Sequence, residues 1–158
     1  MTRTDHLIRG ALLALFASAC SGPESFPAGQ WQIKSEIVRS DIGGREVGFA
    51  KGRTREWSSC IASSETKNPA GRFIPGVLSG SCKFSEASFA NGRIAAKGEC
   101  VSGALFPLRA ELDGRFSNSS LSASLVTVEP NAGMVVGKVD EQDVTTRIAV
   151  EAKRIGDC

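Results

Sequence analysis

Two carboxylates placed two residues apart, Glu111 and Asp113, are the first side chains in this 158-residue sequence whose types and spacing could support catalysis. Side chains of a strand alternate between its two faces, so the pair would project from one face, where carboxylates can act as general acid and general base. Arg109 shares that face and would neutralise one of them. We therefore expect a solvated outer strand face rather than an active site.

Two other charged runs could bind ligands. The acidic run Asp140-Glu-Gln-Asp143 lacks the glycine-punctuated spacing of a calcium loop, so we interpret it as an acidic loop without a metal. The basic stretch Lys51, Arg53 and Arg55 has only Trp57 beside it as a stacking aromatic, in a chain with a net charge of only +2. We therefore expect an outward strand face and no nucleic-acid partner.

Imidazole chemistry is excluded by composition. The single histidine, His6, lies in a segment that we expect to be removed, which leaves no Ser-His or Cys-His nucleophile pair and no imidazole metal ligand. No organised Ser-Lys motif is present either. We expect no cofactor, no metal and no enzymatic activity, with a hydrolase using carboxylates as a remote alternative.

The first nineteen residues have the pattern of a secretory signal peptide. Arg3 and Arg9 precede an uncharged run, residues 10–19, that ends in small residues before Cys20. The run is about half the length of a membrane-spanning helix, which needs roughly 20 residues. We assign residues 1–19 as a cleaved signal peptide.

Cys20 directly follows the expected cut. Ala17-Ser18-Ala19 suits ordinary signal peptidase, while the same residues with Cys20 resemble the bacterial lipobox, in which that cysteine is acylated. Without Cys20, four cysteines remain, an even set that can pair completely in an oxidising compartment. We expect a lipidated Cys20, with a plain secreted protein as the alternative.

Residues 20–29 are expected to form the lipidated cysteine and a short tether rich in Pro and Gly. In enterobacterial lipoproteins Asp at the position after the acylated cysteine retains the protein in the inner membrane. By resemblance, Ser21 favours anchoring in the outer membrane on its periplasmic face. A soluble periplasmic protein is the alternative.

The remaining chain, residues 30–158, is predicted to be a single all-β domain. Apolar residues recur with a period of two rather than at helical spacing. We expect an antiparallel meander of about seven to eight strands curled into a small barrel or sandwich. Residues 63–77 and 130–143 are the two expected long loops, either of which could contain a turn of helix. The alternating segments are 30–40, 53–62, 105–116, 121–125 and 144–155.

Asn91-Gly92 between two strand-like runs predicts a hairpin. A three-residue loop, residues 90–92, with Gly92 in the left-handed conformation, would place Cys82 opposite Cys100, within reach of a disulfide. A two-residue loop would instead place Cys82 opposite Val101. We expect Cys82–Cys100, which leaves Cys60–Cys158; the rival pairing is Cys60–Cys82 with Cys100–Cys158.

Several short motifs together resemble one family. Pro27-Ala-Gly29-Gln-Trp31 begins the domain, Cys82 and Cys100 bracket the hairpin, and the chain ends on Arg154-Ile-Gly156-Asp-Cys158. They resemble the proteobacterial "domain of unknown function 3617" family of small exported proteins, many of them lipoproteins, over residues 27–158. Ala28 interrupts the Pro-Gly pair of that pattern. The resemblance implies no activity and no catalytic residues.

Trp31 and Trp57 could line a small apolar pocket or belong to the core, and we favour the core. The best-supported function is a non-catalytic binding or accessory lipoprotein of the cell envelope. Its partner would be a small hydrophobic ligand in the barrel or an envelope protein. A structural or stress-protective envelope protein without a pocket is the alternative.

Overall fold

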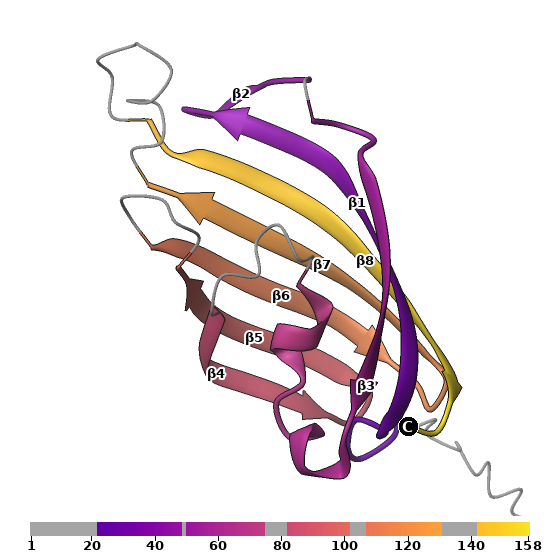
Figure 1. Ribbon diagram of the computed structural model, residues 1–158. Coiled ribbons are helices and arrows are strands. Elements are labelled where there is room, and N and C mark those ends of the chain that lie inside the picture. The colour runs from indigo at the N-terminus through magenta and orange to yellow at the C-terminus, as the bar shows by residue number, and fades with distance from the viewer. Residues whose placement is uncertain (1–21, 49, 75–81, 102–106, 131–141) are drawn as a thin grey trace, which may run out of the picture.

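The structure is a computed structural model that describes residues 22–48, 50–74, 82–101, 107–130 and 142–158. These residues form one antiparallel sheet of eight strands, so the all-β prediction is confirmed (Figure 1). The strands are β1 (Gly29–Ile42), β2 (Arg45–Glu46), β3 (Thr54–Ile61), β4 (Cys82–Ala90), β5 (Arg93–Cys100), β6 (Leu108–Phe116), β7 (Ser120–Glu129) and β8 (Val144–Gly156).

The sheet is a meander from β4 to β8, followed by β1, which pairs with β8 on one side and with β2 and β3 on the other. It curls strongly but stays open, because β3 and β4 do not pair with each other in the described part of the chain. Two short helical turns, η1 (Ser63–Glu65) and η2 (Ala70–Phe73), lie between these edges, as Figure 1 shows. The Asn68 amide donates to the Phe84 carbonyl of β4, and the Trp57 indole of β3 donates to the Arg72 carbonyl.

Period-two burial explains the curl. On β1 the side chains of Trp31, Ile33 and Ser35 are buried while Gln32 and Lys34 are exposed. The same alternation on β5 to β8 gives the sheet one apolar face, which bends around its own side chains to leave water. We call this face the concave face.

The two ends of the sheet differ. The aromatic end carries the start of β1, the ends of β3 and β8, and the β4–β5 and β6–β7 turns; the pocket end carries the opposite strand ends. One disulfide lies at each: Cys60–Cys158 at the aromatic end and Cys82–Cys100 at the pocket end. These are the expected pairs. We call them the terminal disulfide and the hairpin disulfide.

The β4–β5 hairpin has the expected cysteine pair but a different loop. Asn91 and Gly92 both have positive φ, so the turn has two residues rather than three. The expected shift of Cys82 does not occur, because a bulge between Phe84 and Glu86 absorbs one residue and restores the pairing with Cys100. The prediction of the loop was wrong, whereas the pairing was right.

Residues 22–28, expected as part of a tether, lie against the domain. Phe26 is 1% exposed, and its ring centroid lies 4.8 Å from that of Trp31 and 5.1 Å from that of Phe116. The Gly92 amide donates to the Pro23 carbonyl at 3.0 Å. A large buried aromatic supplies the free energy that orders this otherwise polar segment.

Candidate ligand-binding site

The concave face changes character along the strands. On β7 the inward side chains Leu121 and Leu125 are buried and apolar, and Thr127 and Glu129 follow at the next inward positions toward the pocket end. On β8, which runs antiparallel, Thr146 pairs with Thr127 and lies beyond Ile148 in the same direction. The inner surface is therefore apolar near the aromatic end and mixed near the pocket end.

Aromatic side chains fill the apolar half. Phe26 lies at the centre of a cluster drawn from the N-terminal segment, three strands and η2, with ring centroids 4.8–5.8 Å from its own. Trp31 is fully buried there and donates its indole N–H to the Pro27 carbonyl. The members of the cluster are Phe26, Trp31, Phe73, Phe89 and Phe116.

The other half is hollow. A pocket of about 230 Å³ lies at the pocket end, on the concave side of five strands. Its floor includes Ile37, Leu108 and Ile148, and its walls are polar or charged. The lining residues are Ser35, Ile37, Arg53, Arg55, Leu108, Thr127, Glu129, Val144, Thr146 and Ile148. An apolar floor with a few polar groups is the usual composition of a small-molecule site.

Arg53 and Arg55 form one wall of this pocket, on the side of β3. Arg55 pairs with Ser35, a buried residue of the concave face, so the outward orientation expected for the basic stretch was wrong for Arg55. Residues two apart on a strand share one face. Ile61 and Trp57 face inward, so the same alternation would have placed Arg55 and Arg53 on the inner face. Within the described residues neither guanidinium has an ion-pair partner.

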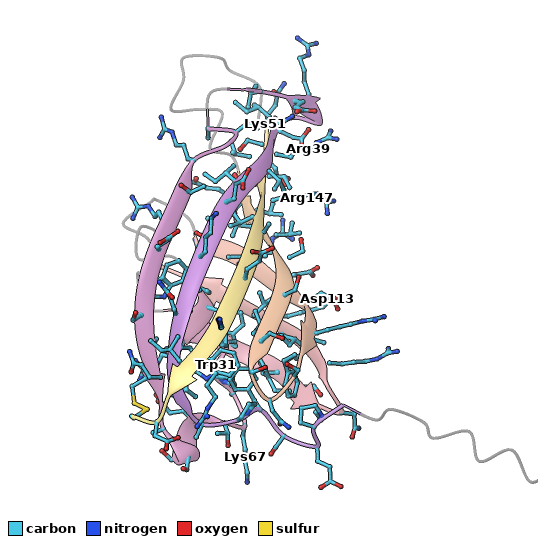
Figure 2. The ribbon with its side chains drawn as sticks, turned by 90° about the vertical axis from the view of Figure 1, so that its right-hand side faces the viewer. Trp31, Arg39, Lys51, Lys67, Asp113 and Arg147 are labelled. Atoms are coloured by element: carbon cyan, nitrogen blue, oxygen red, sulfur yellow. A yellow bond between two sulfur atoms is a disulfide. The ribbon has the colours of Figure 1, made fainter. Side chains whose placement is uncertain are left out.

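Two other basic residues near this end are paired with carboxylates. Lys51 lies 3.4 Å from Glu46, and Arg39 lies 2.7 Å from Asp41 (nitrogen to oxygen). The hydrogen bond from Arg39 is the main cause that lowers the pKa of Asp41 from its ordinary value. Figure 2 shows Arg39 and Lys51 at one end of the sheet and Lys67 at the other. Arg53 and Arg55 have no such partner among the described residues, so their charge is available to a ligand.

Two of the three buried polar side chains in the described residues belong to the pocket. Ser35 is 4% exposed and Thr127 is 3% exposed, and both face the hollow. Over the described ranges neither hydroxyl has a hydrogen-bond partner of its own, and neither is sealed off as a buried unsatisfied group. Each can therefore donate or accept a hydrogen bond from a molecule in the pocket.

The carboxylate pair lies elsewhere. Glu111 and Asp113 are exposed on the outer face of β6. Glu111 pairs with Lys97 at 3.2 Å, while Arg109 lies 3.8 Å from Asp143 rather than neutralising either carboxylate. The solvated outer face expected from the sequence is observed.

The remaining predicted positions divide between the core and the uncertain segments. Trp31 is in the core, and Trp57 is half-buried against it. Cys20 lies outside the described residues, as do residues 140 and 141 of the acidic run. In the described part of the chain no group of three or more potential metal ligands gathers, and no helix is long and apolar enough to cross a membrane.

Fold and site together define a small disulfide-bonded β domain with one open, curled sheet and a pocket at one end. The chain belongs to the family described as "Protein of unknown function (DUF3617)", whose model matches residues 26–158. That match begins at Phe26, the residue at which the aromatic cluster begins. No curated protein and no solved structure matches the chain.

Proposed function

We propose that this protein is a non-catalytic binding module of the cell envelope, anchored by a lipid on Cys20, and that the pocket is its ligand site. The observation that carries the proposal is the hollow half of the concave face. A domain with a purely structural role gains stability by filling its core, as the aromatic half does, whereas a void loses packing contacts. The pocket end therefore gains less stability from packing than the aromatic end, and it provides the space that a binding module needs.

Export is supported by the two disulfides, which join all four cysteines of the described residues. Such bonds persist in oxidising compartments outside the cytosol. Placement in the outer membrane, on its periplasmic face, rests on Ser21 after the expected acylation site.

The anchor and the pocket would lie at opposite ends of the domain. Gly22 packs against Gly92 in the β4–β5 turn, at the aromatic end. Two residues reach about 7 Å at most, so a lipid on Cys20 would hold this turn close to the bilayer. The pocket, at the other end, would then open away from the membrane toward soluble ligands.

A small molecule is favoured over a protein partner by the distribution of exposed apolar residues. In the described part of the chain only Val38, Val101 and Ile155 are large, apolar and exposed. Val38 and Ile155 lie toward opposite ends of the sheet, and Val101 follows β5, which β8, β7 and β6 separate from β1. These residues therefore do not form the contiguous apolar patch that marks a protein-docking surface.

Native mass spectrometry tests the ligand site. The chain from Cys20 onward, carrying C20S, would be exported to a periplasm and purified without reductant, beside a T146W variant whose indole fills the pocket. We expect a bound small molecule on the first protein and none on the second. A bare protein in both samples, or an adduct that survives T146W, would contradict the assignment of the pocket. Labelling with palmitate, abolished by C20S in the full-length chain, tests the anchor.

A further inference from the structure

Charge is distributed unevenly across the pocket. Arg53 and Arg55 lie on the β3 wall, and Glu129 lies on the β7 wall, with β1 and β8 between them. None of the three side chains has an ion-pair partner in the described segments. The electrostatic potential therefore differs between the two walls. A negatively charged group in the pocket is attracted toward β3 and repelled from β7.

The centre of the pocket is apolar. Ile148 is 3% exposed and Leu108 is 4% exposed, and with Ile37 they form the floor. An engineered cavity of about 150 Å³ holds benzene, with six carbon atoms. By proportion, the 230 Å³ observed here accommodates about nine or ten non-hydrogen atoms.

Resting on the proposed function, we propose that the ligand is an amphipathic monoanion: a carboxylate held by Arg55 and Arg53, with a short hydrocarbon body on the floor of Ile37, Leu108 and Ile148. A guanidinium presents parallel N–H donors that match both oxygens of a carboxylate. The hydroxyl groups of Ser35 and Thr127 supply further hydrogen bonds inside the pocket. Glu129 sets the orientation, because it excludes the carboxylate from the opposite wall.

Three eight-carbon probes separate the contributions of charge and hydrocarbon. Octanoate has ten non-hydrogen atoms, while octan-1-ol and octylammonium present the same chain with a neutral and a positive head. Calorimetric titration of the exported C20S chain measures each dissociation constant below the concentration at which the probes aggregate. We expect octanoate to bind at least about tenfold more tightly than the other two, since a hydrogen bond to a charged group is worth that factor or more.

Single substitutions locate the anion. R55Q should weaken octanoate about tenfold while leaving octan-1-ol unchanged, and R53Q should act in the same direction. E129Q should leave octanoate binding equal or tighter. R93Q is the matched control, because Arg93 is exposed at the aromatic end and loses the same charge without touching the pocket.

The outcomes separate the two proposals. Equal binding of all three probes would overturn the anion preference and leave the pocket as an apolar site. Binding of none would overturn the assignment of the pocket itself, and the anion preference with it. A loss of octanoate binding in R93Q as large as in R55Q would show attraction by net charge, which also overturns the inference.

Discussion

Replacing Phe26 by alanine tests whether the segment before β1 is part of the folded domain. The side chain is 1% exposed and contacts four other aromatic rings. Removing a buried phenylalanine costs about 3–5 kcal/mol, from lost burial and from the cavity left behind. A domain of this size is stable by about 5–15 kcal/mol, so the loss would be a large fraction of the total.

The free energy of unfolding is best measured by urea titration of the oxidised, exported protein, with the m-value checked for two-state behaviour. F84A is the control, because Phe84 is only half-buried at the β4 edge and should cost about 1–2 kcal/mol. A loss below about 1 kcal/mol in F26A would refute the packing of residues 22–28. It would also remove the argument that the anchor lies close to the β4–β5 turn.

Three further predictions concern the sheet and its turns. Deleting Ser85, the extra residue of the β4 bulge, should leave a regular hairpin in which Phe84 still lies opposite Gly98 and Cys82 opposite Cys100, so the hairpin disulfide should still form; peptide mapping that finds these two cysteines unjoined would contradict the assignment of the bulge. Changing both cysteines of the terminal disulfide to serine should cost about 4.7 kcal/mol, against about 3 for the hairpin disulfide, because their loops span 98 and 18 residues. Denaturant titration that gave the reverse order would argue against the chain-entropy explanation. The hydrogen bond from Arg72 lowers the pKa of Glu65, so folding gains stability from that carboxylate above its ordinary pKa of 4.5 and loses it as pH falls through the depressed value. E65Q should remove this part of the acid sensitivity, which amounts to no more than about 1 kcal/mol because the pair is exposed. The measurement is the melting temperature of both proteins between about pH 2 and 7, the range over which carboxylates titrate. Parallel profiles for the two proteins would refute the contribution of Glu65.

The strands could be predicted because apolar and polar residues alternate along a strand that buries one of its two faces. Trp31, Ile33 and Ser35 share one face of β1 in sequence and in structure, as do the inward residues of β6 to β8. The type of the hairpin loop was also predictable, whereas the register that places Cys82 opposite Cys100 was not. Asn91-Gly92 favours a two-residue turn, and a bulge at Ser85 leaves no mark in the amino-acid pattern.

The pocket was harder to predict, because it depends on which strands meet. The alternation of β3 indicates the inward side of Arg55, but only the pairing of β3 with β1 places Arg55 opposite Ser35 and so forms the pocket. The packing of Phe26 was not predicted, because the residues around it in the sequence are rich in Pro and Gly, which is typical of a tether. A single large apolar residue within such a segment was the available signal.

The most direct test of the central claim is an amide NMR titration of the isotope-labelled, oxidised chain with octanoate. We expect the largest saturable shifts at Ser35, Ile37, Thr127 and Thr146, around the pocket, and small ones at Trp31 and the rest of the aromatic end. Shifts centred on the aromatic cluster or on the outer face, or no saturable shifts at all, would contradict the account of this pocket as the binding site.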